Sequence, residues 1–134
     1  MNIRLATADD VPVLIKYDKH ISTEELALSI KLRRIYIAEK GGSFAGWLRY
    51  SMFWDNTPFM NMLYILGEFQ NLGIGKSLTQ LWENDMKSKG FDTLMTSTVS
   101  SEYAQHFYNK LGYYAIGGFT LPGDEYEIIM CKKF

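Results

Sequence analysis

The sequence predicts an α/β (α+β) domain in which helices pack on a mixed β-sheet. Along the chain, the period of the apolar residues alternates between that of a strand and that of a helix. The resulting order of elements is β-α-α-β-β-β-α-β-α-β-β. A length of 134 residues, without repeats or a linker-like stretch, predicts a single domain over residues 1–134.

The first third of the chain predicts a short strand followed by two helices. Residues 2–6 alternate between apolar and polar side chains, as in a strand. Thr7 and Asp10 form an N-cap pattern, and Pro12 falls in the opening turn of the helix that follows. The run Ser-Thr-Glu-Glu at residues 22–25 is typical of the start of a second helix.

The middle of the chain predicts three strands and a long helix. Residues 35–39 and 44–53 are expected to be strands joined by a tight turn at residues 40–43. Residues 59–66 are almost continuously apolar, which indicates a central strand buried on both faces. Residues 73–89 have the spacing of an amphipathic helix.

The last third predicts a strand, a helix and two further strands. The first strand covers residues 93–99, and Ser100 or Ser101 is expected to cap the helix that follows. The last two strands are expected at residues 113–119 and 125–132, with the final one as an exposed edge.

The composition argues against several classes of function. A net charge of −1 and a pI of about 6.1 provide no global basic field for nucleic acid or an anionic membrane. No apolar run approaches the roughly 20 residues that span a bilayer. The single cysteine, Cys131, allows no internal disulfide, and we expect a buried thiol in a cytoplasmic protein. His20 and His106 have no partners at metal-ligand spacing, so no metal is expected.

The segment Gln70–Ser77 carries the clearest chemical signal. It lies between an apolar strand and an amphipathic helix and contains Gly73 and Gly75. Glycines allow a ligand to approach the backbone closely, and the first amides of a helix have no partner within the helix. These donors, together with the positive end of the helix dipole, form a site suited to a pyrophosphate.

Two familiar nucleotide-binding patterns do not fit this segment. An NTPase phosphate loop requires glycine where Gln70 stands, and a dinucleotide-binding fingerprint requires glycine where Leu78 stands. A glycine-rich turn without a ligand remains an alternative on the evidence of the loop alone.

The Gln-x-x-Gly-x-Gly spacing after a strand resembles the acyl-CoA pyrophosphate motif of the GNAT superfamily of N-acetyltransferases. The segment Phe107-Tyr-Asn-Lys-Leu-Gly-Tyr113 is similar to the family's second signature, and the specific resemblance runs over residues 63–113. It implies a mostly antiparallel twisted sheet of six to seven strands with about four helices. It also implies a V-shaped splay between two central parallel strands.

The resemblance implies an acetyl-CoA-dependent N-acetyltransferase that transfers the acetyl group directly to a primary amine. The pantetheine arm would follow the backbone of Leu63, Tyr64 and Ile65. Tyr108 matches the catalytic tyrosine beside the CoA sulfur. The expected cofactor-binding residues of the loop and the second motif are Gln70, Asn71, Leu72, Gly73, Ile74, Gly75, Lys76, Ser77 and Ser101. Ser101 stands where relatives often have asparagine.

Two departures from the family concern the chemistry. Asn61 and Thr96 stand where relatives often carry a glutamate base, and neither accepts a proton at neutral pH. An unperturbed tyrosine with a pKa near 10 protonates a thiolate of pKa near 8.5 uphill by about 2 kcal/mol, so Tyr108 is better interpreted as a hydrogen-bond donor. The missing base favours an acceptor amine of low pKa. It also leaves open a non-catalytic acyl-CoA-binding or interaction domain. For either function, the sequence allows a monomer or a homodimer.

Overall fold

The structure, a computed structural model, describes residues 1–134 and confirms the predicted fold class. The strands are β1 (Asn2–Leu5), β2 (Ile35–Lys40), β3 (Ser43–Phe53), β4 (Thr57–Ile65), β5 (Thr93–Val99), β6 (Tyr114–Phe119) and β7 (Glu127–Lys133). The α-helices are α1 (Val11–Tyr17), α2 (Thr23–Lys31), α3 (Ile74–Ser88) and α4 (Ala104–Lys110), and the short 3₁₀ turns are η1 (Ala8–Asp10) and η2 (Gly67–Phe69). The strand order in the sheet is β1-β2-β3-β4-β5-β7-β6. The sheet is mostly antiparallel, and β4 and β5 form its parallel pair.

The chain forms two compact parts that interleave in sequence. The N-terminal part comprises Met1–Ser51 and Met62–Gln80, and the C-terminal part comprises Met52–Asn61 and Leu81–Phe134. Three elements, β3, β4 and α3, therefore contribute residues to both parts.

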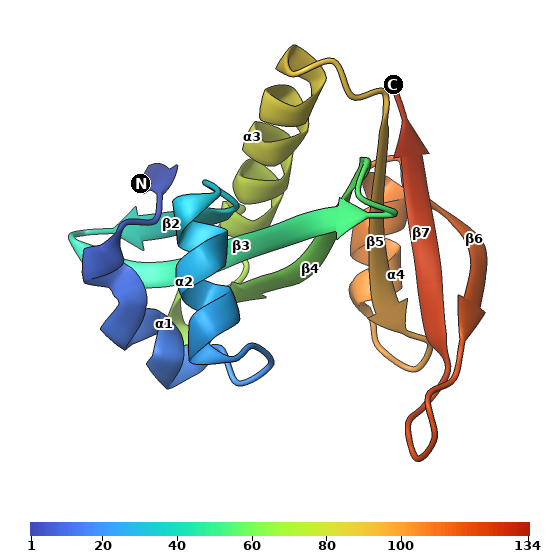
Figure 1. Cartoon of the computed structure of the whole chain (residues 1–134), viewed down its shortest axis with the longest axis horizontal. Coiled ribbons are helices and arrows are strands. Elements are labelled where there is room, and N and C mark those ends of the chain that lie inside the picture. Colours follow the sequence, from blue (N-terminus) through green and yellow to red (C-terminus); the bar gives the residue numbers. More distant parts are fainter. The chain divides into compact units, whose positions relative to one another are not determined.

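In the N-terminal part, α1 and α2 pack on one face of the strands β2 and β3 (Figure 1). The residues of this core, which come from the first strand region, both helices and the two strands, are Ala6, Leu14, Leu26, Ile35, Ile37 and Trp47. The helices begin where the sequence indicates. Pro12 lies in the first turn of α1, and the Ser22 hydroxyl accepts a hydrogen bond from the Glu25 amide at 3.2 Å.

A buried ion pair ties α1 to β3. Arg49 donates to the Asp18 carboxylate through Nε at 2.9 Å and through Nη2 at 3.3 Å. The Trp47 indole nitrogen and the His20 amide also donate to Asp18, each at 3.2 Å. Because four donors surround it, the buried carboxylate is well compensated for the loss of water.

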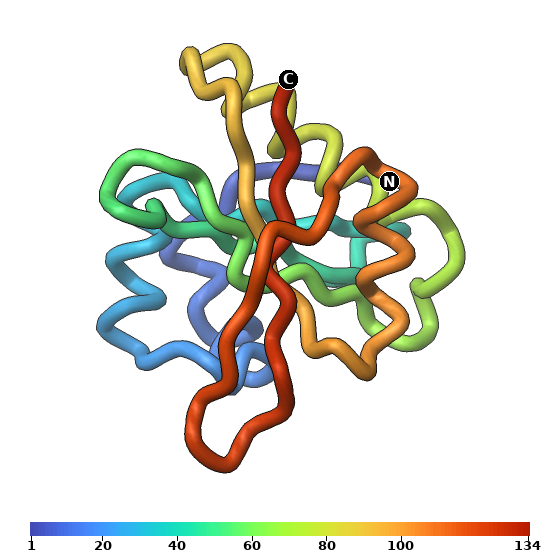
Figure 2. The backbone as a smooth tube through the Cα atoms, turned by 90° about the vertical axis from the view of Figure 1, so that its right-hand side faces the viewer, coloured from blue at the N-terminus to red at the C-terminus, as the bar shows by residue number.

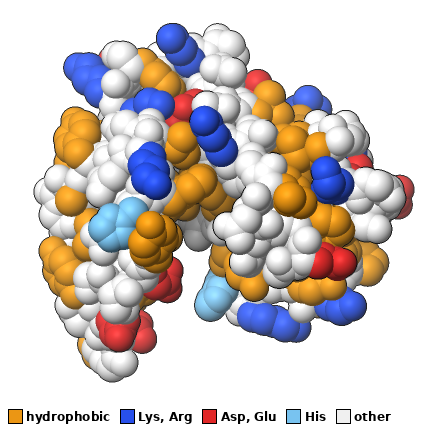
Figure 3. Space-filling model, turned by 180° about the vertical axis from the view of Figure 1, so that it is seen from behind, with side chains coloured by type: hydrophobic (Ala, Val, Ile, Leu, Met, Phe, Trp, Pro, Cys, Tyr) orange, Lys and Arg blue, Asp and Glu red, His pale blue; other side chains and the backbone are white.

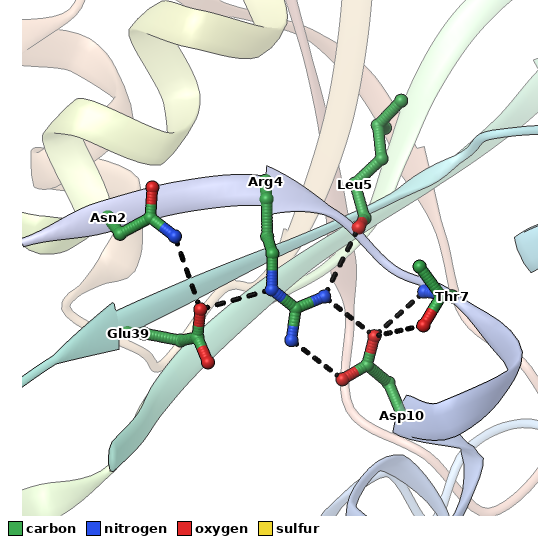
Figure 4. Close-up of polar contacts among 6 residues, drawn as sticks. All are labelled: Asn2, Arg4, Leu5, Thr7, Asp10 and Glu39. Carbon is green, nitrogen blue, oxygen red and sulfur yellow. Dashed lines mark hydrogen bonds and ion pairs between the residues drawn. The ribbon is translucent and has the colours of Figure 1, made fainter. Parts of the chain in front are cut away.

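A second ionic cluster joins β1, η1 and β2 (Figure 4). The Arg4 guanidinium binds both carboxylate oxygens of Asp10, each at 2.8 Å, and donates to Glu39 through Nε at 3.0 Å. Asp10 also accepts the amide of Thr7 at 2.7 Å, as the N-cap pattern predicts. Hydrogen bonds from Arg4 lower the pKa of both carboxyl groups.

In the C-terminal part, β7 lies between β5 and β6 (Figure 2). Met95 of β5 is opposite Cys131 of β7, which is opposite Tyr114 of β6. The prediction that the final strand is an exposed edge is therefore wrong, and β6 occupies the edge instead. The order of elements in the sequence does not reveal that the last strand, β7, inserts between the two preceding strands, β5 and β6.

A polar network in the C-terminal part joins Glu83, Tyr113 and Lys132. Tyr113 donates its hydroxyl proton to the Glu83 carboxylate at 2.7 Å, and Lys132 donates to the other oxygen at 3.0 Å. Glu83 is on α3 and Lys132 is on β7, so this network ties a helix to the sheet.

Two further local predictions are wrong. Neither Ser100 nor Ser101 caps α4, because Tyr103 is the N-cap residue and has no side-chain capping bond. The strand β4 is not buried on both faces, since Asn61 is exposed and Tyr64 is 48% exposed. An apolar run indicates a place in the sheet, but it does not determine which of its side chains other elements cover.

The face of the molecule in Figure 3 carries basic, acidic and hydrophobic side chains together, so this face has no single-sign character. None of the helices combines the length and the apolar character that crossing a membrane requires.

Candidate functional site

The glycine-rich loop and the start of α3 lie in the N-terminal part. The Ser77 amide donates to the Gly73 carbonyl at 3.0 Å, which is the first helical hydrogen bond of α3. The amides of residues 73–76 precede this bond and have no partner within the helix. Asn71, Leu72, Gly73 and Lys76 are exposed, Gly75 and Ser77 are half-buried, and Ile74 is buried.

The backbone of this loop is curved by two residues in the left-handed region. Asn71 has a φ of 62° and Gly73 has a φ of 81°. Such residues turn successive N–H groups toward one concave side, which is a general arrangement for binding anions. A Cβ atom on Gly73 would meet no atom within 4 Å, so glycine is required here by its φ angle and not by crowding.

A side-chain hydrogen bond connects this loop to the end of β4. The Gln70 amide nitrogen donates to the Ile65 carbonyl at 2.9 Å. The structure thus brings together the two segments in which cofactor-binding residues were predicted, Leu63–Ile65 and Gln70–Ser77. The Gln70 side chain holds the loop, and one lone pair of the Ile65 carbonyl is occupied.

Gly46 shapes the same end of β4, and the sequence analysis missed it. A Cβ atom on Gly46 would lie 2.5 Å from the Tyr64 carbonyl oxygen and 2.7 Å from Cδ1 of Ile65. Only glycine allows β3 to approach the backbone of Tyr64 and Ile65 so closely. The available signal was a glycine inside an apolar strand, a pattern that often marks a close backbone approach.

Tyr108 lies in the C-terminal part, on the buried face of α4. It is 6% exposed, and its ring contacts Tyr113 edge-on at a centroid distance of 5.7 Å. Its hydroxyl lies 3.6 Å from the sulfur of Met60, which is a weak acceptor. Burial raises the pKa of the Tyr108 hydroxyl to about 12, and the neighbouring Thr96 side chain acts in the opposite direction.

The face of β5 beneath Tyr108 carries two buried threonines. The Thr96 hydroxyl donates to the Met60 carbonyl at 3.0 Å, so its proton is engaged in the sheet. Thr98, two residues along the same face, is 5% exposed, and its hydroxyl has no hydrogen-bond partner in the protein. This buried hydroxyl was also missed, because threonine in a strand is common and gives no distinct signal.

Ser101 lies in the exposed turn between β5 and α4. Its hydroxyl donates to the Glu125 carboxylate at 2.7 Å, across 24 residues of sequence. The side chain therefore links this turn to the segment before β7.

Comparison with known proteins identifies the family. Residues 7–113 match the family model described as "Acetyltransferase (GNAT) family", and the chain belongs to this family. Members of the family are acyltransferases that use acetyl-CoA. None of the curated proteins matches the chain.

Solved structures share the fold over nearly the whole chain. A GNAT-family acetyltransferase from Bacillus cereus is 26% identical, with a TM-score of 0.79 over 98% of this chain and 96% of its own. The ribosomal-protein-S18-alanine N-acetyltransferase from Escherichia coli is 19% identical, with a TM-score of 0.83 over 98% of this chain and 92% of its own. PaiA N-acetyltransferase from Thermoplasma acidophilum, solved with coenzyme A, is 22% identical, with a TM-score of 0.79 over 99% and 98%.

Proposed function

We propose that this chain transfers the acetyl group of acetyl-CoA directly to a primary amine. The supporting observation is the start of α3, where the amides of residues 73–76 have no partner within the helix and the preceding turn has positive φ angles at Asn71 and Gly73. Amides at a helix N-terminus stabilise a pyrophosphate by hydrogen bonding and by the helix dipole. The backbone of residues 63–65 would hold the pantetheine arm as an added strand, in the V-shaped splay that the family resemblance implies.

Tyr108 would act as a hydrogen-bond donor to the departing sulfur. With a pKa of about 12, this tyrosine would protonate a thiolate of ordinary pKa uphill by about 5 kcal/mol. Full proton transfer from Tyr108 is therefore a poor route, whereas donation of a hydrogen bond requires only that the hydroxyl keep its proton. The weak sulfur contact of Met60 leaves the Tyr108 proton available for a stronger acceptor.

The reaction forms a bond between the amine nitrogen and the acetyl carbon and breaks the carbon–sulfur bond. The amine loses a proton and the thiolate gains one. Asn61 and Thr96 provide no base for the amine. An α-amino group of pKa near 8 has a larger neutral fraction at pH 7 than a lysine of pKa near 10.4, by roughly two orders of magnitude. We therefore expect an acceptor amine of low pKa.

The protein would work as a single cytoplasmic domain over residues 1–134, either as a monomer or as a homodimer. A single buried cysteine supports the cytoplasmic placement, because it forms no disulfide within the chain. A net charge of −1 provides no global basic field for nucleic acid, so the proposed partner is an amine-bearing small molecule or peptide.

Calorimetry with coenzyme A and an acetyl-transfer assay would test the proposal. We expect coenzyme A to bind, and we expect a peptide with a free α-amino group to be acetylated faster than one whose only amine is a lysine side chain. Absence of coenzyme A binding by well-folded protein would refute the assignment of the loop. A marked preference for lysine would refute the argument from the missing base.

The second candidate is a domain that binds acyl-CoA without turning it over. The observation that favours it is the engaged Thr96 hydroxyl and the absence of a carboxylate at both positions where relatives often have a base. Tight binding of acetyl-CoA with no transfer to any amine in a panel of small amines and peptides would support this alternative.

A further inference from the structure

A cavity of about 390 Å³ lies within the C-terminal part, and the proposed function does not use it. Its lining residues come from the end of β3, the β3–β4 turn, the start of β4, and β5, β6 and β7. They are Phe53, Trp54, Thr57, Thr93, Met95, Ile116, Gly117, Ile129 and Cys131. The volume falls within the range of pockets that hold small molecules.

The cavity is on the side of the strands away from Tyr108. Thr96 is next to Tyr108, and successive side chains of a strand point to opposite faces, so Met95 points to the other face. Cys131 and Met95 are paired across β5 and β7 and both line the cavity. In Figure 2 the β3–β4 turn and α4 lie on opposite sides of these strands. The cavity is thus distinct from the surroundings of the proposed catalytic tyrosine.

The lining selects for an uncharged ligand. None of its residues is an acid, a lysine, an arginine or a histidine. A charged group placed there would lose water without gaining an ionic partner. The two threonine hydroxyls are already engaged, because Thr57 donates to Asn56 at 2.8 Å and Thr93 donates to Asp92 at 3.0 Å.

A strained turn holds an aromatic ring at the rim. Trp54 and Asp55 have φ angles of 53° and 63°, a conformation that is sterically costly for a residue as bulky as tryptophan. The Trp54 side chain is 79% exposed and packs against Phe53 at a centroid distance of 4.8 Å. Strain of this kind is concentrated at ligand clamps and binding sites. An exposed ring supported by a second ring provides a flat surface on which another aromatic ring can stack.

We propose that this cavity is a binding site for an uncharged aromatic molecule, which stacks on Trp54 and inserts between the turn and the sheet. The proposal does not depend on acetyl transfer, since neither Tyr108 nor the glycine-rich loop lines the cavity.

Nile red, an uncharged aromatic dye whose emission reports an apolar environment, is the probe. We expect saturable binding of one dye per chain, with unchanged affinity in the presence of saturating coenzyme A. Competition by coenzyme A would mean that the dye occupies the donor site and would overturn the proposal. Absence of saturable binding would overturn it as well.

Ile129→Trp should fill the cavity and weaken dye binding by about tenfold or more. Leu121→Trp is the matched control, because it adds the same ring at an exposed position that does not line the cavity. Its dye affinity should equal that of the original chain. Equal weakening in both variants, or in neither, would contradict the assignment.

Alkylation of Cys131 gives a second test that requires no substitution. It is the single cysteine of the chain, is 8% exposed and lines the cavity. Saturating Nile red should slow its reaction with N-ethylmaleimide several-fold, as followed by mass spectrometry. An unchanged rate would show that the dye binds elsewhere. Chromatography with light scattering completes the test, since dimerisation that abolishes dye binding would identify a second copy of the chain as the occupant and overturn the proposal.

Discussion

At the scale of single residues, the buried polar groups differ in how well the protein compensates them. Asp18 is surrounded by donors from Arg49, Trp47 and His20, so its charge is compensated within the protein. The hydroxyl of Tyr108 has a weak sulfur acceptor, and that of Thr98 has no partner in the protein. Buried groups left with weak partners are where a ligand gains most from hydrogen bonding.

Replacing Tyr108 by phenylalanine tests its role as a donor. Tyr108→Phe keeps the ring that packs against Tyr113 and removes only the hydroxyl. We expect kcat for acetyl transfer to fall about a hundredfold, as for other deleted transition-state donors, while coenzyme A affinity stays nearly unchanged. Steady-state kinetics and calorimetry measure the two effects. An unaltered kcat would remove Tyr108 from the mechanism.

At the scale of elements, the start of α3 and the end of β4 are held in place by backbone geometry. Gly73 allows the loop to curve before α3, and Gly46 allows β3 to approach Tyr64 and Ile65. The Gln70 hydrogen bond to Ile65 connects the two segments. Both glycines therefore act on the proposed donor site through the position of the backbone and not through a side chain.

Gly73→Ala should weaken coenzyme A binding at the start of α3. Alanine at a φ of 81° costs about 1–2 kcal/mol of folding stability, and relief of this strain would turn the amides. Gly90→Ala is the matched control, because Gly90 has a φ of 95°, equally open surroundings and a place just beyond the other end of α3. Thermal unfolding should show a similar decrease in Tm for both variants. Calorimetry should show weaker binding of coenzyme A in Gly73→Ala alone. Equal affinities in the two variants would contradict the loop assignment.

Gly46→Ala should destabilise the N-terminal part. The added Cβ would clash with a backbone oxygen that cannot rotate away, and overpacking of this kind costs about 1–3 kcal/mol. Gly67→Ala provides the comparison, since its Cβ would meet nothing within 4 Å. Urea denaturation should show a lower midpoint for Gly46→Ala and little change for Gly67→Ala. Similar midpoints in both would mean that β4 tolerates displacement at Tyr64.

At the scale of the whole molecule, acid stability should depend on the Arg4 cluster. The pKa of Asp10 is lowered in the folded state, chiefly by its hydrogen bond from Arg4. A lowered pKa stabilises the fold above the unfolded-state pKa of about 4, and this stabilisation is lost as the pH falls through the folded-state pKa. We therefore expect Tm to decline below about pH 4 as Asp10 gains a proton.

Arg4→Met should lower Tm at pH 7 and flatten its decline in acid, because Asp10 would then lack the partner that lowers its pKa. The Tm of Arg4→Lys at pH 7 should lie between those of Arg4→Met and the original chain. Lysine keeps the charge but not the paired contact with both carboxylate oxygens. Calorimetric scans from pH 7 to pH 3 measure the effect. A parallel decline in Arg4→Met and the original chain would show that other carboxylates control acid unfolding.

Much of the fold and part of the candidate site were predictable because their signals are local. The cap at Ser22, the turn between β2 and β3 and the amphipathic face of α3 each depend on residues a few positions apart. The pyrophosphate loop belongs to the same class, because unpaired amides and left-handed residues are properties of one short segment. The sequence by itself thus determined the elements, their order, the family and the loop proposed to bind the donor.

Tertiary structure alone decided which strand forms the edge, which face of β4 is covered and where Ser101 points. Ser101 binds Glu125 across 24 residues of sequence, and β7 inserts between β5 and β6. Tertiary structure also decided the close approach of Gly46 to the Tyr64 carbonyl and the presence of the cavity beside Trp54. The physical reason is that strand pairing and side-chain burial depend on contacts between distant segments, which no short pattern of residues encodes.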